Sequence, residues 1–146
     1  MVMSDVSGAE RRYMKTFKAK WNKKAVQDDG AYMSKEAKSF VTAFKNMLKR
    51  ELGGEGFNIV RISPNHYDLS GFIEKDGRYC YIAYTMPRWG ERIDFSDNGA
   101  ARGVMYRVAK NDRDFRGGHN NFSAIENLPN ALRSLYDNER RWQEVM

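Results

Sequence analysis

Two β-rich runs joined by the dipeptide Asp76-Gly77 constrain the fold of this chain more than any other feature. Residues 67–75 and 78–85 are rich in aromatic and β-branched side chains, and Asp-Gly between such runs is among the stronger short-range signals for a hairpin. A two-residue loop sets three cross-strand pairs, which are Lys75–Arg78, Ile73–Cys80 and Phe72–Tyr81. The middle of the chain therefore predicts antiparallel pairing, with one apolar face that includes Ile73 and Cys80.

The rest of the chain divides into elements where the hydrophobic period changes. The predicted elements, in order, are helices over 9–27 and 34–52, strands over 57–63, 67–75, 78–85, 92–95 and 103–110, and a helix over 129–144. Sequential strands joined by short turns favour a meander with the helices on one face. We therefore expect a single α+β domain over residues 1–146, with two N-terminal helices, a four- to five-stranded antiparallel sheet and a C-terminal helix.

Positive charge is concentrated near the N-terminus. The chain has 25 Lys and Arg against 19 Asp and Glu, a formal net charge of +6, and residues 10–24 account for the whole excess. After a flexible start over residues 1–8, we expect this segment to form a basic helix within 9–30, at the periphery of the core. Such a local excess is typical of polyanion binding, although a solvated helix face has the same composition. The candidate contacts are Arg11, Arg12, Lys15, Lys18, Lys23 and Lys24.

Two further patterns accompany the basic segment. Tyr13, Phe17 and Trp21 recur every four residues; such a stripe can stack on nucleobases, but more often it belongs to the core. In the second predicted helix, three lysines form a stripe opposite the apolar side, with the second and third each within about 20° of the first. These lysines are either a second set of contacts or a solvated face, and they are Lys38, Lys45 and Lys49.

Two predicted loops carry residues that suit an interface. One contains Arg88, Trp89 and Arg92, and the other contains Arg113, Arg116, His119 and Asn120. Arg and Trp are favoured anchors at interfaces, and Arg also suits phosphate. If the predicted strands alternate up and down, the two loops share one end of the sheet. The alternative is that Trp89 covers the edge of the core and the arginines are solvated.

The sequence contains no motif that is typical of an enzyme or of a cofactor site. His66 and His119 lack a second ligand at zinc spacing, and no phosphate-binding glycine loop or nucleophile elbow occurs. Cys80 lies in mid-strand, which favours a small buried apolar residue over a nucleophile. Five carboxylates on or beside strands could serve a metal-dependent nuclease, although turn chemistry explains several of them; they are Asp68, Glu74, Glu91, Asp94 and Asp97. We therefore expect no catalysis, no metal and no cofactor.

The sequence favours a cytoplasmic protein without membrane contact. One cysteine cannot build a disulfide framework, so the fold does not depend on an oxidising compartment. The N-terminus has no apolar run that could serve as a signal peptide or a membrane span.

The stretch from Tyr79 to Phe122 resembles small uncharacterised proteins carried by phages and conjugative elements of Gram-positive bacteria. The matching residues are Tyr81-Ile82-Ala83-Tyr84, Arg88-Trp89, Val104-Met105-Tyr106-Arg107-Val108-Ala109-Lys110, Asp114-Phe115, Gly117-Gly118 and Asn120. The resemblance covers about a third of the chain, leaves the basic helix outside and transfers no catalytic residue. Small mobile-element proteins without an enzyme motif often counter host defence, as anti-CRISPR and anti-restriction proteins do. The resemblance therefore implies an anti-defence role in the cytoplasm of a bacterial host.

Three hypotheses about function follow. The leading one is a non-catalytic phage or mobile-element accessory protein of the anti-CRISPR type, which inhibits a host nucleic-acid-handling defence complex by stoichiometric binding. Its partner would be nucleic acid or a nucleoprotein complex such as a CRISPR effector, with the basic helix giving affinity and the loops specificity. The alternative is a stand-alone DNA- or RNA-binding protein. The third hypothesis is a metal-dependent nuclease.

Overall fold

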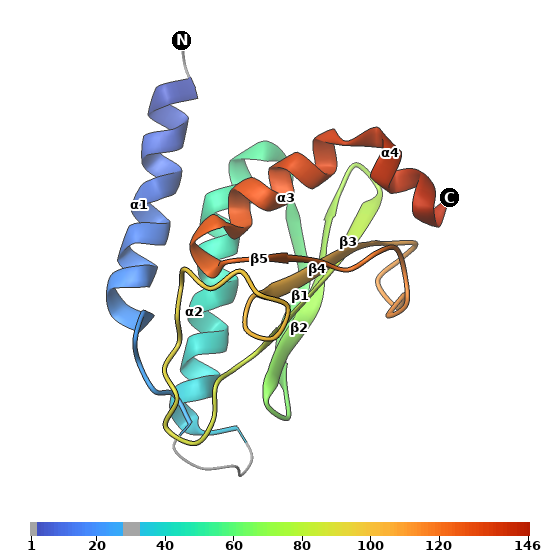
Figure 1. Ribbon diagram of the computed structural model, residues 1–146. Coiled ribbons are helices and arrows are strands. Elements are labelled where there is room, and N and C mark those ends of the chain that lie inside the picture. The colour runs from blue at the N-terminus through green and yellow to red at the C-terminus, as the bar shows by residue number, and fades with distance from the viewer. Residues whose placement is uncertain (1–2, 28–32) are drawn as a thin grey trace.

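The computed structural model describes the backbone of residues 3–27 and 33–146, and the side chains of residues 12–27 and 33–146 (Figure 1). Its α-helices are α1 (Met3–Trp21), α2 (Lys35–Leu52), α3 (Leu128–Asp137) and α4 (Glu139–Trp142). Its strands are β1 (Asn58–Asn65), β2 (Asp68–Lys75), β3 (Arg78–Thr85), β4 (Val104–Ala109) and β5 (Asn121–Ser123). Residues 28–30, the last part of the segment in which the basic helix is predicted, and the side chain of Arg11 lie outside the described residues.

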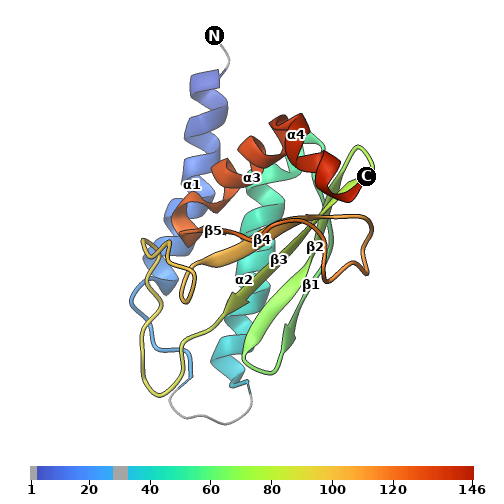
Figure 2. The same cartoon turned by 45° about the vertical axis from the view of Figure 1, so that its right-hand side comes forward.

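The described strands form one five-stranded antiparallel sheet in the order β1-β2-β3-β4-β5 (Figure 2). Each strand pairs with the next one along the chain, which is the predicted meander. All three predicted cross-strand pairs of the β2–β3 hairpin occur, among them Ile73 with Cys80. Asp76 and Gly77 form its turn with φ values of 54° and 78°, the positive values that a two-residue hairpin loop requires. The predicted α+β class is therefore confirmed.

The predicted strand over residues 92–95 is wrong. This segment leaves the sheet and bonds instead to the chain just after α1: the Lys23 N–H donates to the Ile93 carbonyl at 2.7 Å, and the Ile93 N–H donates to the Lys24 carbonyl at 2.8 Å. The fifth strand is β5, which pairs with β4 and comes from the stretch predicted as a loop. Ile93 and Phe95 are nevertheless buried. Their alternating pattern therefore reflects burial rather than sheet pairing.

The helix ends also differ from the prediction. The first helix occupies Met3–Trp21 rather than 9–27, because Lys23 has a φ of 67° and its N–H bonds to Ile93 instead of continuing the helix. The C-terminal helix is interrupted at Asn138, whose φ of −98° and ψ of 91° separate α3 from α4. The flexibility of residues 1–8 stays a prediction.

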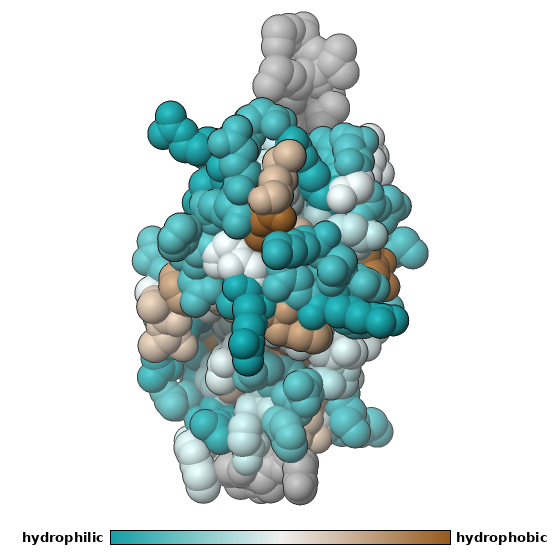
Figure 3. All heavy atoms as spheres, turned by 90° about the vertical axis from the view of Figure 1, so that its right-hand side faces the viewer, coloured by the Kyte–Doolittle hydropathy of each residue, from teal (hydrophilic) through white to brown (hydrophobic). Residues whose placement is uncertain are grey.

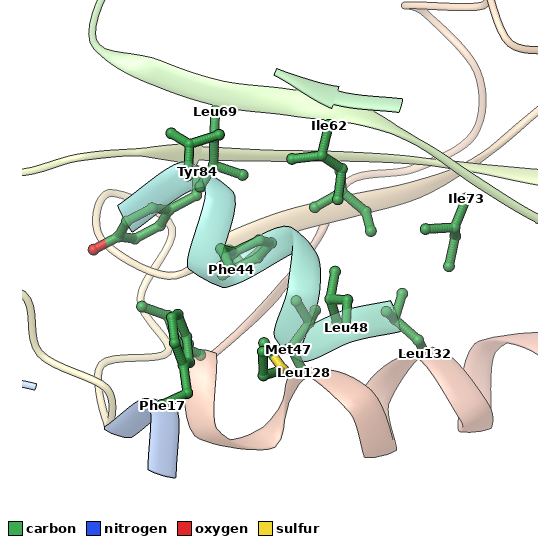
Figure 4. Close-up of a cluster of buried hydrophobic side chains, with 14 of the residues drawn as sticks. Phe17, Phe44, Met47, Leu48, Ile62, Leu69, Ile73, Tyr84, Leu128 and Leu132 are labelled. Carbon is green, nitrogen blue, oxygen red and sulfur yellow. The ribbon is translucent and has the colours of Figure 1, made fainter. Parts of the chain in front are cut away.

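The core lies between the helices and one face of the sheet. In Figure 4, α2 lies between the strands on one side and α1 and α3 on the other. Ser34 is the N-cap of α2, and its hydroxyl accepts a hydrogen bond from the Ala37 N–H at 3.0 Å. The ring of Phe17 stacks 5.5 Å from that of Phe40, and Trp21 is buried too. The aromatic stripe of the first helix therefore belongs to the core, except for Tyr13, which is 37% exposed.

Cys80 is fully buried in this core. Burial raises the pKa of its thiol from 9.0 to about 12, so the thiol stays protonated at mildly alkaline pH. Because the thiolate is the reactive form, we expect an aromatic-disulfide reagent to label Cys80 in guanidinium chloride but not in native buffer. The absorbance of the released thiol measures this difference. Rapid labelling of the native protein would contradict the buried placement.

Candidate nucleic-acid interface

Six exposed cations lie on the solvent sides of α1 and α2. On α2, Lys38, Lys45 and Lys49 recur at helical spacing and are exposed, as the sequence predicts, but they lie on one flank of the helix rather than opposite its buried side. Three further cations from the two helices line the groove between them. We call these two sets of cations together the α1–α2 face, and its members are Arg12, Lys20, Lys38, Lys45, Lys49 and Arg50.

The groove between α1 and α2 has a volume of about 420 Å³. Its lining combines the buried side chains of Phe17 and Met47 with the exposed cations Lys20 and Arg50. The Arg50 guanidinium lies 5.9 Å from the centroid of the Tyr13 ring. An aromatic ring beside cations can contact both a nucleobase and a phosphate.

No described carboxylate neutralises the α1–α2 face. The acids of α2 are Glu36 and Glu51. Glu36 lies in the first turn, 3.8 Å from Lys24. Glu51 is buried, where its carboxylate accepts a hydrogen bond from the Met14 N–H at 3.1 Å and lies near Arg133. The six cations of the face form no ion pair with another described residue, so their charge is presented to solvent.

Half of the contacts predicted in the basic N-terminal segment are instead held in ion pairs within the protein. These pairs are Lys18–Glu126 at 3.1 Å, Lys23–Asp94 at 3.4 Å and Lys24–Glu36 at 3.8 Å. Arg12 and Lys15 remain exposed without an ion pair to a described residue. Sequence reasoning missed Lys20 and Arg50 as contacts. Arg50 follows the predicted lysine stripe directly, but it lies about 100° further around α2, where only the position of α1 gives it a groove to line.

The two predicted interface loops lie at opposite ends of the sheet, so the prediction that they share one end is wrong. Arg88 and Trp89 follow the end of β3, whereas residues 110–120 follow the end of β4. Because β3 and β4 are antiparallel neighbours, their outgoing connections leave the sheet at opposite ends. The error comes from the predicted strand over 92–95. With that strand in the sheet, the strand after it would run in the same direction as β3, and the two loops would leave at the same end. Figure 1 shows the two connections on different sides of the molecule, in yellow and orange.

The connection between β3 and β4 surrounds a pocket of about 550 Å³. The Arg88 guanidinium stacks on the Tyr67 ring, 3.9 Å from its centroid. Arg92 donates a hydrogen bond to the Lys23 carbonyl at 2.8 Å. Trp89 is 69% exposed, so it does not cover the edge of the core.

The 110–120 loop is held together by side chains that accept hydrogen bonds. Asp114 accepts from the Lys110 N–H at 2.9 Å, which lowers the pKa of this carboxyl below its ordinary value. Glu144 accepts from the His119 N–H at 2.9 Å, and this bond lowers the pKa of Glu144. Asn120 accepts from the guanidinium of a β4 residue at 2.9 Å. The remaining predicted contacts in this loop are exposed, and they are Arg113 and Arg116.

The sheet face opposite the core carries an aromatic cluster that sequence reasoning missed. Phe72, Tyr81 and Phe115 contact one another with ring centroids 5.1, 5.5 and 5.6 Å apart. Arg61 lies over Phe72 and Arg107 over Tyr81. The cluster buries Phe72 fully and fixes the 110–120 loop to β2 and β3. On the side of the molecule shown in Figure 3, apolar residues form only small separate patches.

The carboxylates considered for a nuclease mostly hold turns and ion pairs. Glu74 accepts from the Gly77 N–H at 2.8 Å, which lowers the pKa of Glu74. Asp94 accepts from the Ser96 hydroxyl at 2.7 Å, and this bond lowers the pKa of Asp94. Glu91 pairs with an arginine and Asp97 accepts from a turn N–H. Among the side chains of residues 12–27 and 33–146, no group of three or more His, Cys, Asp or Glu residues is placed to hold a metal ion.

No family model, curated protein or solved structure matches this chain. No helix in the described part of the chain is long and apolar enough to cross a membrane.

Proposed function

We propose that this protein binds nucleic acid without acting on it chemically, and that the α1–α2 face contacts the phosphate backbone. The observation that carries the proposal is a set of six exposed cations on two neighbouring helices, with no neutralising carboxylate among the described residues. Interactions with phosphate dominate the affinity of most nucleic-acid-binding surfaces, and they need cations that no acid of the protein has already paired.

The spacing of the cations supports contact with a phosphate backbone. Lys38 and Lys49 are eleven residues apart on α2, which corresponds to about 16 Å along the helix. That length matches about five nucleotide steps of one strand of a duplex. The stripe consists of lysines, which contact phosphates and do not by themselves distinguish one nucleobase from another. We therefore expect binding with little sequence preference.

The biological target that we propose is a host nucleoprotein complex whose activity the protein blocks by stoichiometric binding, as an anti-CRISPR protein does. The support is the resemblance of residues 79–122 to small mobile-element proteins together with the cationic face. The chain as a whole is basic, with a net charge of +6, so an acidic mimic of DNA is disfavoured. Contact with guide RNA or bound DNA fits this charge better.

A salt titration tests the binding proposal. We expect affinity for a short duplex to fall steeply as salt rises, with a slope of log K against log salt approaching about −5, because each phosphate neutralised contributes about 0.9. Fluorescence anisotropy of a labelled duplex measures the slope. Absence of binding to every nucleic acid at low salt would overturn the proposal.

Affinity purification from a bacterial lysate, with and without nuclease treatment, separates the two kinds of target. A captured nuclease complex that survives nuclease treatment supports inhibition through a host protein. Capture that nuclease treatment abolishes supports a stand-alone nucleic-acid-binding protein.

A further inference from the structure

Trp89 occupies a backbone conformation that a tryptophan rarely adopts. It lies in the four-residue turn Arg88–Glu91, which the Glu91 N–H closes by donating to the Arg88 carbonyl at 3.1 Å. Both central residues have positive φ, 62° at Trp89 and 76° at Gly90, as in the type I′ turn that Asn-Gly forms best. A bulky side chain in the left-handed region is unfavourable.

The fold gains little from having a tryptophan at this position. The side chain is 69% exposed, whereas Trp21 and Trp142 are buried. An asparagine would suit the turn better and would leave no hole in the core. A costly conformation that places a large exposed aromatic ring is typical of a residue selected for binding.

The turn that carries Trp89 is tied to the rest of the protein at several points. The Gly90 N–H donates to the Gln27 carbonyl at 3.2 Å. Arg88 stacks on Tyr67 of the β1–β2 turn, and Arg92 donates to the Lys23 carbonyl. The ring is therefore presented on an ordered platform, and ordering costs on binding are small.

The surroundings of Trp89 favour an anionic ligand with a flat ring. Arg88 and Arg92 line the pocket of about 550 Å³ beside it, and neither forms an ion pair with a described residue. The pocket's acids are bonded within the protein, Asp94 to Lys23, Glu91 to an arginine and Asp97 to a backbone N–H, and the four cations of the lining exceed its three acids by one. Volumes of this order hold a nucleotide-sized ligand.

We propose that Trp89 is a stacking site for one unpaired nucleobase of a single-stranded nucleic acid, with Arg88 and Arg92 placed to contact the adjoining phosphates. This proposal rests on the proposed function and deepens it, because it names a second site that takes single strands. Base-on-aromatic stacking tolerates any sequence, since every base has a π-face. The α1–α2 face then contacts phosphate in general, and Trp89 adds a preference for unpaired segments.

The test compares Trp89→Asn with the wild type and with Trp89→Phe. We expect Trp89→Asn to bind a short single-stranded oligonucleotide at least about tenfold more weakly, with unchanged affinity for a duplex of the same length. The same variant should raise Tm by about 2–4 °C, because asparagine suits the turn. Trp89→Phe should keep most of the single-strand affinity, because the phenyl ring still stacks.

Two further readouts keep the result interpretable. Single-stranded oligonucleotide should quench the fluorescence of the exposed Trp89, since the other two tryptophans are buried. Phe115→Ala, which removes a 54% exposed ring near the other end of the sheet, is the matched control and should leave single-strand affinity unchanged. Unchanged single-strand affinity in Trp89→Asn, or a lower Tm in that variant, overturns this inference. The proposed function still stands in that case if the wild type binds the duplex. A wild type that binds neither strand form overturns the proposed function itself.

Discussion

Replacing Arg12, Lys38, Lys45 and Lys49 with glutamine is expected to weaken binding to a short DNA duplex at least about 100-fold at about 0.1 M salt. These four cations are exposed and form no ion pair with a described residue, so glutamine removes charge and leaves the packing intact. The salt slope should become shallower by about 3 to 4, because four phosphate contacts are lost. Anisotropy titrations at several salt concentrations measure both quantities, and an unchanged Tm shows that the fold is retained.

The matched control removes the same net charge elsewhere. Four exposed cations outside the α1–α2 face serve for this purpose, and they are Lys110, Arg113, Arg116 and Arg140. Their replacement by glutamine should weaken binding by less than about fivefold, since only long-range attraction changes. Equal losses in the two variants would show that net charge matters and the α1–α2 face does not. A larger loss in the control would move the site to the 110–120 loop.

Gly71→Ala is expected to destabilise the native state by about 3 kcal/mol or more, because backbone atoms occupy the space that the new methyl group needs. A Cβ at Gly71 would lie 1.8 Å from the Arg61 carbonyl oxygen and 2.8 Å from the Ile62 Cα. An irregularity in β1 between Ile59 and Arg61 accompanies this close approach to β2. Relief of the clash requires β1 to move away and break ladder bonds.

Urea denaturation monitored by circular dichroism measures the change. Gly53→Ala is the matched control, because Gly53 has a φ of −60° and a Cβ there meets nothing within 4 Å. We expect it to be neutral or to stabilise by about 0.5 kcal/mol. A Gly71→Ala midpoint equal to that of the wild type would show that β1 and β2 are not in such close contact.

The local sequence pattern was sufficient to predict those parts of the fold that depend on residues close together in the chain. Asp76-Gly77 sets the register of β2 against β3, since the loop length and the positive φ values leave one pairing. The apolar side of α2 and the exposed lysine stripe follow from a 3.6-residue period. Sequential pairing of short-turn strands also gave the meander.

Long-range contacts determined the structure of the segment for which the local pattern gave a wrong prediction. The alternation around Ile93 and Phe95 is that of a strand, yet Ile93 bonds to the chain after α1 and both residues enter the core. Period-2 burial does not distinguish a sheet strand from an extended segment that packs on a helix. Because this segment is not a strand, the 110–120 loop lies at the opposite end of the sheet from the one predicted.

The candidate site divides in the same way. The sequence by itself determined how much positive charge the chain carries, where the helices place it and which cations can face solvent, because helical periodicity is local. Only the tertiary structure decided which cations remain available. Lys18 and Lys23 meet Glu126 and Asp94, which are far away in the chain, whereas Arg50 gains the groove beside α1. Pairing of charges depends on three-dimensional distance, and a linear pattern does not contain that distance.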